Sequence, residues 1–190
     1  MTQAHHSAPF KMTAEQYLQL GEDPPGVRLE LVDGEILVSP SPTVEHAYVL
    51  SQLFGILRAH IVAHKLGLIM SDTDHRLTLY DVRRPDLYYF PTDRIHLLGD
   101  GPIKHPPELA IEVISPGSEK TDRIKKSAAY AEFGIPNYWI ADPKGRSLKA
   151  FKLRRRKYVA AGSGSRDAEI SFSPFDDLTI NLGELWWPPK

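Results

Sequence analysis

Residues 108–115 read Glu108-Leu-Ala-Ile-Glu-Val-Ile-Ser, an apolar stretch with a carboxylate in its middle. Its length and composition are typical of a buried strand. Because strand side chains alternate between two faces, Leu109, Ile111 and Val113 share one face, while Glu112 belongs to the other. A buried charge is costly unless it is paired or bound to a cation. Glu112 is therefore a candidate metal ligand, with a structural ion pair or a half-exposed sheet face as the alternatives.

A helix that could supply a cation follows this strand. Residues 118–133 have a helical pattern and end before Gly134, a residue suited to the position after a helix. Asp122, Lys126 and Tyr130 recur every four residues and so line one face of that helix. Lys126 either faces the strand or lies on a solvated face, because periodicity does not decide which face meets the sheet.

Two further carboxylates lie in apolar surroundings. Asp86 opens the aromatic stretch Leu87-Tyr-Tyr-Phe90, where the alternative is a strand-end or turn aspartate, and Glu30 lies within Leu29-Glu-Leu-Val32. Acids on neighbouring strands lie about 5 Å apart and can share a hard divalent ion. Ligands that are all oxygen favour Mg²⁺ or Mn²⁺ over zinc.

The remaining pattern predicts an α/β or α+β domain built on one mixed sheet. Asp33-Gly34 is typical of a tight hairpin turn. A capping box opens at Thr13. Helices are expected at 13–20, 44–65 and 118–133, and strands at 28–32, 35–38, 77–79, 86–90, 109–114, 138–141, 148–153, 158–161 and 178–181.

Composition bounds the function classes. The chain has 190 residues, so we expect a single domain over 1–190, with residues 1–12 as a flexible arm. The absence of cysteine excludes thiol catalysis, iron–sulfur clusters and disulfides. No apolar run approaches the roughly 20 residues of a membrane span, and the first residues do not resemble a secretory signal. We therefore expect a cytoplasmic protein with no membrane partner.

Charge is uneven along the chain, although the formal net charge is only −1. From residue 143 to residue 166 there are nine basic residues and no acidic one. The run Lys149–Tyr158 could grip phosphates, or its part Arg154–Lys157 could be a solvated hairpin turn. Trp186-Trp187 is better explained as a packed terminus or a subunit contact than as a base-stacking platform.

The chain contains an ordered set of motifs. It comprises Leu29-Glu-Leu-Val-Asp-Gly, Pro42-(x)3-His46, Arg84-Pro-Asp86, Glu108-Leu-Ala-Ile-Glu-Val-Ile-Ser-Pro, and Asp122-(x)3-Lys126-(x)3-Tyr130-(x)3-Gly134-Ile-Pro-Asn-Tyr-Trp-Ile-Ala-Asp142. This set resembles the Uma2 family, also called DUF820, of the PD-(D/E)XK nuclease superfamily. The resemblance covers about Thr13 to Asp142, with a similar tail to Trp186.

The resemblance implies a restriction-endonuclease-like core, with a central mixed β-sheet flanked by helices. It makes Asp86 the motif aspartate and Glu112 the second acid, and Glu30 matches an early glutamate near the metal. The superfamily usually places its lysine two residues after the second acid, where this chain has Ile114, so the lysine maps to Lys126 instead. His46 matches a family position with an open role: catalytic, packing or capping.

The resemblance also implies Mg²⁺-assisted hydrolysis of phosphodiester bonds, with Mn²⁺ as a substitute ion. Asp86, Glu112 and the backbone carbonyl of Val113 would hold the ion. Glu30 would bind it through water or hold a second ion, and Lys126 would orient the attacking water or stabilise charge. This hypothesis requires Lys126 within about 8 Å of the Glu112 carboxylate.

The implied partner is nucleic acid, with DNA favoured over RNA, and cutting both strands of a duplex would require a homo-oligomer. A catalytically inactive nuclease-fold module that acts in interaction or oligomerisation is the main alternative. A two-carboxylate glycosidase is a further one, but it would leave Lys126 without a task.

Overall fold

The computed structural model of the chain describes residues 11–115 and 121–188. At its centre is a six-stranded mixed sheet with the order β10-β9-β8-β7-β6-β3. The strands are β3 (Gly67–Met70), β6 (Leu87–Pro91), β7 (Leu109–Val113), β8 (Asn137–Asp142), β9 (Ser147–Arg154) and β10 (Lys157–Ser165). Strands β7 and β8 are parallel, and the other neighbours are antiparallel. The predicted central mixed sheet is confirmed.

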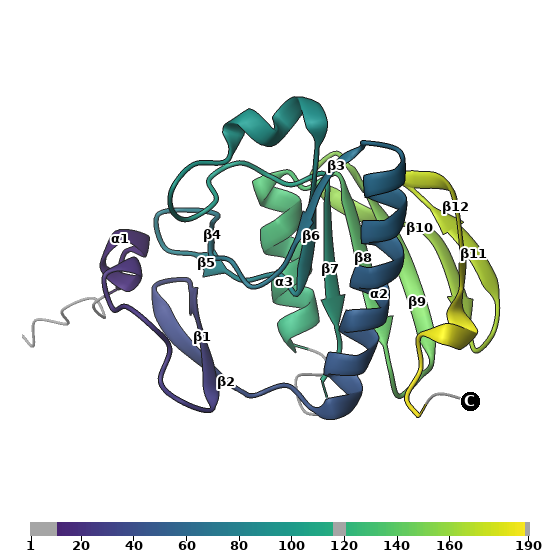
Figure 1. Cartoon of the computed structure of the whole chain (residues 1–190). Coiled ribbons are helices and arrows are strands. Elements are labelled where there is room, and N and C mark those ends of the chain that lie inside the picture. Colours follow the sequence, from purple (N-terminus) through teal and green to yellow (C-terminus); the bar gives the residue numbers. More distant parts are fainter. Residues whose placement is uncertain (1–10, 116–120, 189–190) are drawn as a thin grey trace, which may run out of the picture.

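Two helices cover opposite faces of this sheet (Figure 1). Helix α2 (Val44–Ala63) begins at Thr43, whose hydroxyl accepts a hydrogen bond from the backbone N–H of His46. Helix α3 (Thr121–Phe133) connects the parallel strands β7 and β8, as a crossover connection must. It is followed by Gly134 at a φ of 93°, which fits the role predicted for this glycine.

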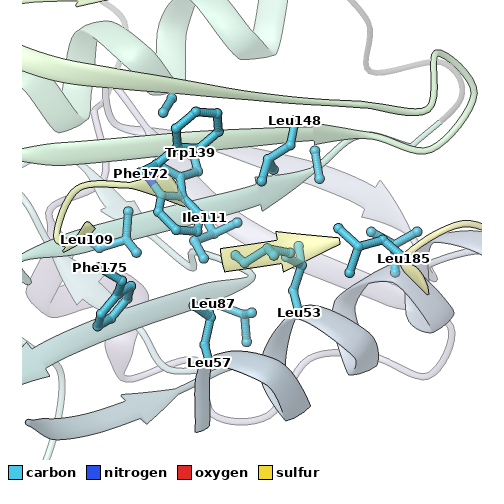
Figure 2. Close-up of a cluster of buried hydrophobic side chains, with 14 of the residues drawn as sticks. Leu53, Leu57, Leu87, Leu109, Ile111, Trp139, Leu148, Phe172, Phe175 and Leu185 are labelled. Carbon is cyan, nitrogen blue, oxygen red and sulfur yellow. The ribbon is translucent and has the colours of Figure 1, made fainter. Parts of the chain in front are cut away.

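The predicted alternation of side chains along β7 is confirmed. Leu109, Ile111 and Val113 belong to the main hydrophobic cluster, to which α2 contributes Leu53 and Leu57. Figure 2 shows Leu109 and Ile111 in this cluster, between the α2 leucines and Trp139. The opposite face of β7 forms a second cluster that contains residues of α3. The sheet is therefore buried on both faces at β7, as a strand in a parallel pair usually is.

Two smaller sheets add to the single sheet that the sequence predicts. One has the order β2-β1-β5-β4, and the other pairs β11 with β12. Their strands are β1 (Val27–Val32), β2 (Glu35–Pro40), β4 (His75–Arg76), β5 (Val82–Arg83), β11 (Glu169–Phe172) and β12 (Phe175–Asn181). The β1–β2 turn has Asp33 and Gly34 at positive φ, as its sequence predicts. Short helices complete the fold: α1 (Ala14–Leu18), with the predicted capping box, and the 3₁₀ helices η1 (Thr92–Leu97) and η2 (Leu182–Glu184).

The prediction of a strand at 77–79 is wrong. That segment enters a turn in which the Thr78 hydroxyl donates to the Asp81 carboxylate and the backbone N–H of Leu77 donates to the Asp81 carbonyl. Of the arm predicted over 1–12, residues 1–10 lie outside the described residues. Lys11 forms an ion pair with Asp33. Residues 118–120 of the predicted third helix also lie outside the described part.

The C-terminal segment supports the packed-terminus interpretation for one of the two tryptophans. Trp186 is buried, and its indole N–H donates to the backbone carbonyl of Arg166. Trp187 is partly exposed, with its ring in edge contact with Tyr48. Across residues 11–115 and 121–188, no helix has both the length and the apolarity needed to cross a membrane.

Candidate active site

The four side chains predicted to carry the chemistry meet at one cavity of about 370 Å³. They come from four different elements. Glu30 is on β1, Asp86 lies just before β6, Glu112 is on β7 and Lys126 is on α3. Val113, whose backbone carbonyl is a metal ligand in the hypothesis that the family resemblance implies, lines the same cavity.

The sheet register brings Asp86 and Glu112 together. Leu87 pairs with Ile111 in the antiparallel β6–β7 ladder, so the residues one step outward, Asp86 and Glu112, come side by side. The backbone N–H of Val113 donates to Asp86 Oδ2 over 2.8 Å, which fixes the aspartate against the end of β7. Both carboxylates are buried.

Asp86 is surrounded by positive or hydrogen-donating groups. Arg28 donates to Oδ1 over 3.0 Å, and His46 Nε2 lies 3.2 Å from Oδ2. Burial alone would raise the pKa of the Asp86 carboxyl, but the hydrogen bond to His46 and the charges of Lys126 and Arg28 outweigh it. The pKa of Asp86 therefore lies below its ordinary value, and the group is ionised at neutral pH.

Glu112 is held by the helix that follows it. Lys126 Nζ donates to Oε2 over 2.9 Å, and the Tyr130 hydroxyl donates to Oε1 over 2.6 Å. The predicted proximity of Lys126 to Glu112 is thus confirmed. Burial raises the pKa of Glu112 above its ordinary value, and the neighbouring carboxylates of Asp86 and Glu30 add to this, against the lowering by Lys126.

The face of α3 that carries Lys126 and Tyr130 packs against the sheet. Tyr130 is fully buried and Lys126 points inward, whereas Ile124 is 69% exposed. Burial lowers the pKa of Lys126, but the three carboxylates of Glu112, Glu30 and Asp86 raise it by more, so the ammonium group stays charged. The lysine therefore acts as a fixed cation and cannot accept a proton at neutral pH.

Glu30 is the third carboxylate of the site, and it comes from β1 in the sheet with the order β2-β1-β5-β4. Its Oε1 accepts a hydrogen bond of 2.8 Å from the backbone N–H of Arg84 and lies 3.5 Å from Lys126 Nζ. Arg84 is itself anchored by ion pairs with Asp23 and Asp74. This network ties the loop before Asp86 to β1.

Two partners of Asp86 were not identified from the sequence. Arg28 stands two residues before Glu30, and residues i and i+2 of a strand share a face, so an inward Glu30 could have indicated an inward Arg28. The role left open for His46 receives a geometric answer. Its ring is buried in the first turn of α2, where it reaches Asp86.

The chemical type of the donors suits a hard divalent cation. Three carboxylates of Glu30, Asp86 and Glu112 face one cavity, and oxygen ligands of this kind suit Mg²⁺ and Mn²⁺. Each carboxylate is already compensated by a cation or a backbone donor, which allows the three negative charges to share a buried space.

The basic run is divided between a hairpin turn and the face of the sheet that carries Glu112. Arg155 and Arg156 form the turn of the β9–β10 hairpin, both at positive φ, in agreement with the hairpin alternative. Across the sheet, Glu112 pairs with Ile140 and Ile140 pairs with Lys149, so Lys149 lies on the face of Glu112. It is exposed, about 10 Å from Glu112 at the usual strand spacing.

Comparisons with known proteins identify the family and the fold of the chain. The family profile Uma2, described as "Putative restriction endonuclease", matches residues 14–183. Among solved structures, the chain is similar to a putative nuclease belonging to DUF820 from Anabaena variabilis ATCC 29413. The TM-score is 0.75 and the identity 20%, over 92% of this chain and 97% of that one. A search of curated proteins finds no match.

Proposed function

Because the chain belongs to the Uma2 family, we propose that it is a metal-dependent endonuclease that hydrolyses phosphodiester bonds of nucleic acid, with DNA as the polymer. The observation that carries this proposal is the convergence of Glu30, Asp86 and Glu112 on one cavity, beside the charged Lys126. The inactive-module alternative is less favoured, because burying three carboxylates side by side costs free energy that a non-catalytic module would not need to spend.

Asp86 and Glu112 would hold Mg²⁺ or Mn²⁺ together with the carbonyl of Val113, and Glu30 would bind through water or hold a second ion. When bound, the ion supplies Lewis-acid chemistry, since it polarises the phosphate and lowers the pKa of a water molecule. The charge-balanced arrangement of Arg28, His46 and Asp86 keeps the aspartate ionised and oriented before an ion arrives.

Lys126 acts as a positive charge in this proposal and not as a base. Its raised pKa removes it as a general base, so it stabilises negative charge that develops on the phosphate, and it can orient the attacking water through a donated hydrogen bond. Tyr130 keeps Glu112 in place through its hydroxyl. Arg28, His46 and Tyr130 are therefore positioning residues in this proposal.

Lys149 supplies a phosphate contact outside the cavity. It is exposed and lies on the Glu112 face, two strands away from the carboxylates. A nucleic-acid backbone that crosses β8 from the cavity would meet this ammonium group. One active site per chain cuts one strand at a time, so we also propose that cleavage of both strands of a duplex uses a homodimer.

The experiment is cleavage of supercoiled plasmid, single-stranded DNA and RNA in the presence of Mg²⁺ or Mn²⁺. Wild type is compared with Glu112→Gln and Lys126→Met, and Lys125→Met is the matched control, because Lys125 is the exposed neighbour of Lys126. We expect metal-dependent nicking of DNA by wild type and the control, and a loss of about 10²–10³-fold in Lys126→Met.

Nicking that persists in Glu112→Gln at the wild-type rate would contradict the assigned site. Cleavage of RNA alone would correct the polymer and keep the mechanism. An absence of cleavage in every sample, together with an absence of Mn²⁺ binding, would favour the non-catalytic module.

A further inference from the structure

A second cluster of metal-binding side chains lies at the opposite end of helix α2 from the candidate active site. His60 and His64 are one helical turn apart at the C-terminal end of α2, and Asp177 is on β12. One ligand atom from each of the three residues lies within 4.8 Å of the other two. His60 is fourteen residues from His46, which places it about 21 Å further along the helix. The cluster is therefore separate from the carboxylate site.

His60 has a buried nitrogen that lacks a hydrogen bond. Its side chain is only 7% exposed, and its Nε2 has no hydrogen-bond partner among the described residues. This Nε2 lies 3.4 Å from Asp177 Oδ1, and the ring packs edge-on against Phe175. A buried nitrogen without a hydrogen bond costs free energy unless another ligand satisfies it.

His64 is arranged as metal-binding histidines usually are. Its Nδ1 lies 3.0 Å from the backbone carbonyl of His60. A proton on Nδ1 that is donated to this carbonyl leaves the lone pair of Nε2 for a metal, and it fixes the orientation of the ring. His64 and Asp177 are exposed, so an ion can reach the cluster from solvent.

We propose that His60, His64 and Asp177 form a Zn²⁺ site that joins the end of α2 to the β11–β12 hairpin. Two imidazoles and one carboxylate are a common set of zinc ligands, and they leave a fourth position for water. Two histidines at i and i+4 on one helix face are a known way to bind this ion. The negative end of the helix dipole further favours a cation at this terminus.

The donor chemistry separates this site from the active site. The active site offers three carboxylates, which suit Mg²⁺, whereas the α2–β12 cluster offers two nitrogens and one oxygen, which suit Zn²⁺. Zn²⁺ here would act on stability, because it would link α2 to a hairpin that packs against the main hydrophobic cluster through Ile170 and Phe175.

The test is a calorimetric titration of the full-length, metal-free protein with Zn²⁺, followed by thermal unfolding with and without the ion. Wild type is compared with His64→Ala and Asp177→Asn, which change two exposed side chains of the cluster. His96→Ala is the control, since His96 is an exposed histidine outside the cluster. Asp86→Asn identifies any Zn²⁺ that binds at the active site instead.

We expect one equivalent of Zn²⁺ to bind to wild type, His96→Ala and Asp86→Asn, and to raise their Tm. The affinity for Zn²⁺ should fall by at least about 10–100-fold in His64→Ala and Asp177→Asn. Removal of even a residue that only hydrogen-bonds to a metal ligand causes a loss of this size. Mg²⁺-dependent cleavage by His64→Ala should equal that of wild type. Unchanged Zn²⁺ affinity and Tm shift in both cluster variants would overturn the proposal, whether or not the protein is a nuclease.

Discussion

The two faces of strand β7 have opposite chemistry, although their residues alternate along one five-residue strand. On the α2 face, the side chains of Leu109, Ile111 and Val113 belong to the main hydrophobic cluster. On the α3 face, Glu112 is buried with two other carboxylates, and its charge is balanced by Lys126. The first face stabilises the fold, whereas the second buries charges that contribute little net stability. Stability and activity should therefore respond to different substitutions on neighbouring residues.

The largest expected effect is on activity, in Glu112→Gln. Loss of the ionised carboxylate should reduce metal-dependent cleavage by about 10³-fold or more, which corresponds to the several kcal/mol that a bound metal contributes. Folding should not suffer. The raised pKa of Glu112 means that the folded state disfavours the ionised form, and a neutral amide removes that cost. Cleavage rates and denaturant unfolding at about pH 8 measure the two effects. A large loss of stability in Glu112→Gln would contradict the claim that the charges on the α3 face contribute little net stability.

The reverse result is expected one residue earlier, in Ile111→Ala. Ile111 is fully buried on the α2 face, so its truncation should lower the free energy of unfolding by about 2–5 kcal/mol. The folded fraction should keep its metal affinity and cleavage rate, because the side chain does not reach the cavity. Ile111→Val, with an expected loss of about 0.5–1.5 kcal/mol, guards against complete unfolding. A loss of metal affinity in the folded Ile111→Val protein would show that the two faces are not independent.

A third test concerns a buried polar group that lacks the pairing found at the site. His75 is fully buried, and neither ring nitrogen has a hydrogen-bond partner among the described residues. Burial lowers the pKa of His75 from 6.5 to about 3. The unfolded chain therefore binds a proton that the folded chain does not, and stability falls as the pH drops below about 6.5.

This histidine should cost about 2 kcal/mol between about pH 7 and about pH 5, at about 1.4 kcal/mol per pH unit. His75→Phe preserves an aromatic ring against Tyr88 and removes the titrating group. Denaturant unfolding of both proteins at the two pH values measures the difference. An equal pH dependence in wild type and His75→Phe would mean that this histidine is satisfied in the folded state.

The smallest effect is expected for the two faces at strand β9. Lys149 lies on the Glu112 face, whereas Lys152 lines a groove with Phe172 on the opposite side. Lys149→Ala should weaken DNA binding at all sequences and reduce the salt dependence of binding by about one phosphate contact. Lys152→Ala should change neither. Equal losses in both variants would indicate that DNA does not follow the Glu112 face.

The alternation along β7 could be predicted from the sequence because it follows from strand geometry alone. The sequence does not predict strand β3, because Gly67–Met70 continues the apolar run of α2, or strand β11, because its four residues are at the lower limit of length for a recognisable alternation. The strand predicted at 77–79 failed because Thr78 and Asp81 side chains close a turn there. Short segments of this kind take their structure from neighbours that are distant in the sequence.

The site could be predicted only in part, because local patterns indicate some of its residues and not their contacts. Apolar context, helical spacing and family resemblance predict Glu30, Asp86, Glu112 and Lys126. The contacts of Arg28 and His46 with Asp86 depend on how β1 and α2 pack against the central sheet. No local pattern contains that packing. The Zn²⁺ cluster is a similar case, because Asp177 is more than a hundred residues away from its histidines.

The most direct test of the central claim is a calorimetric titration with Mn²⁺ of wild type, Asp86→Asn and His64→Ala. We expect the three carboxylates on the α3 side to form a divalent-metal site before nucleic acid arrives. Wild type and His64→Ala should then bind Mn²⁺ with the same affinity, and Asp86→Asn should lose this binding. Retention of wild-type Mn²⁺ affinity in Asp86→Asn would contradict this expectation.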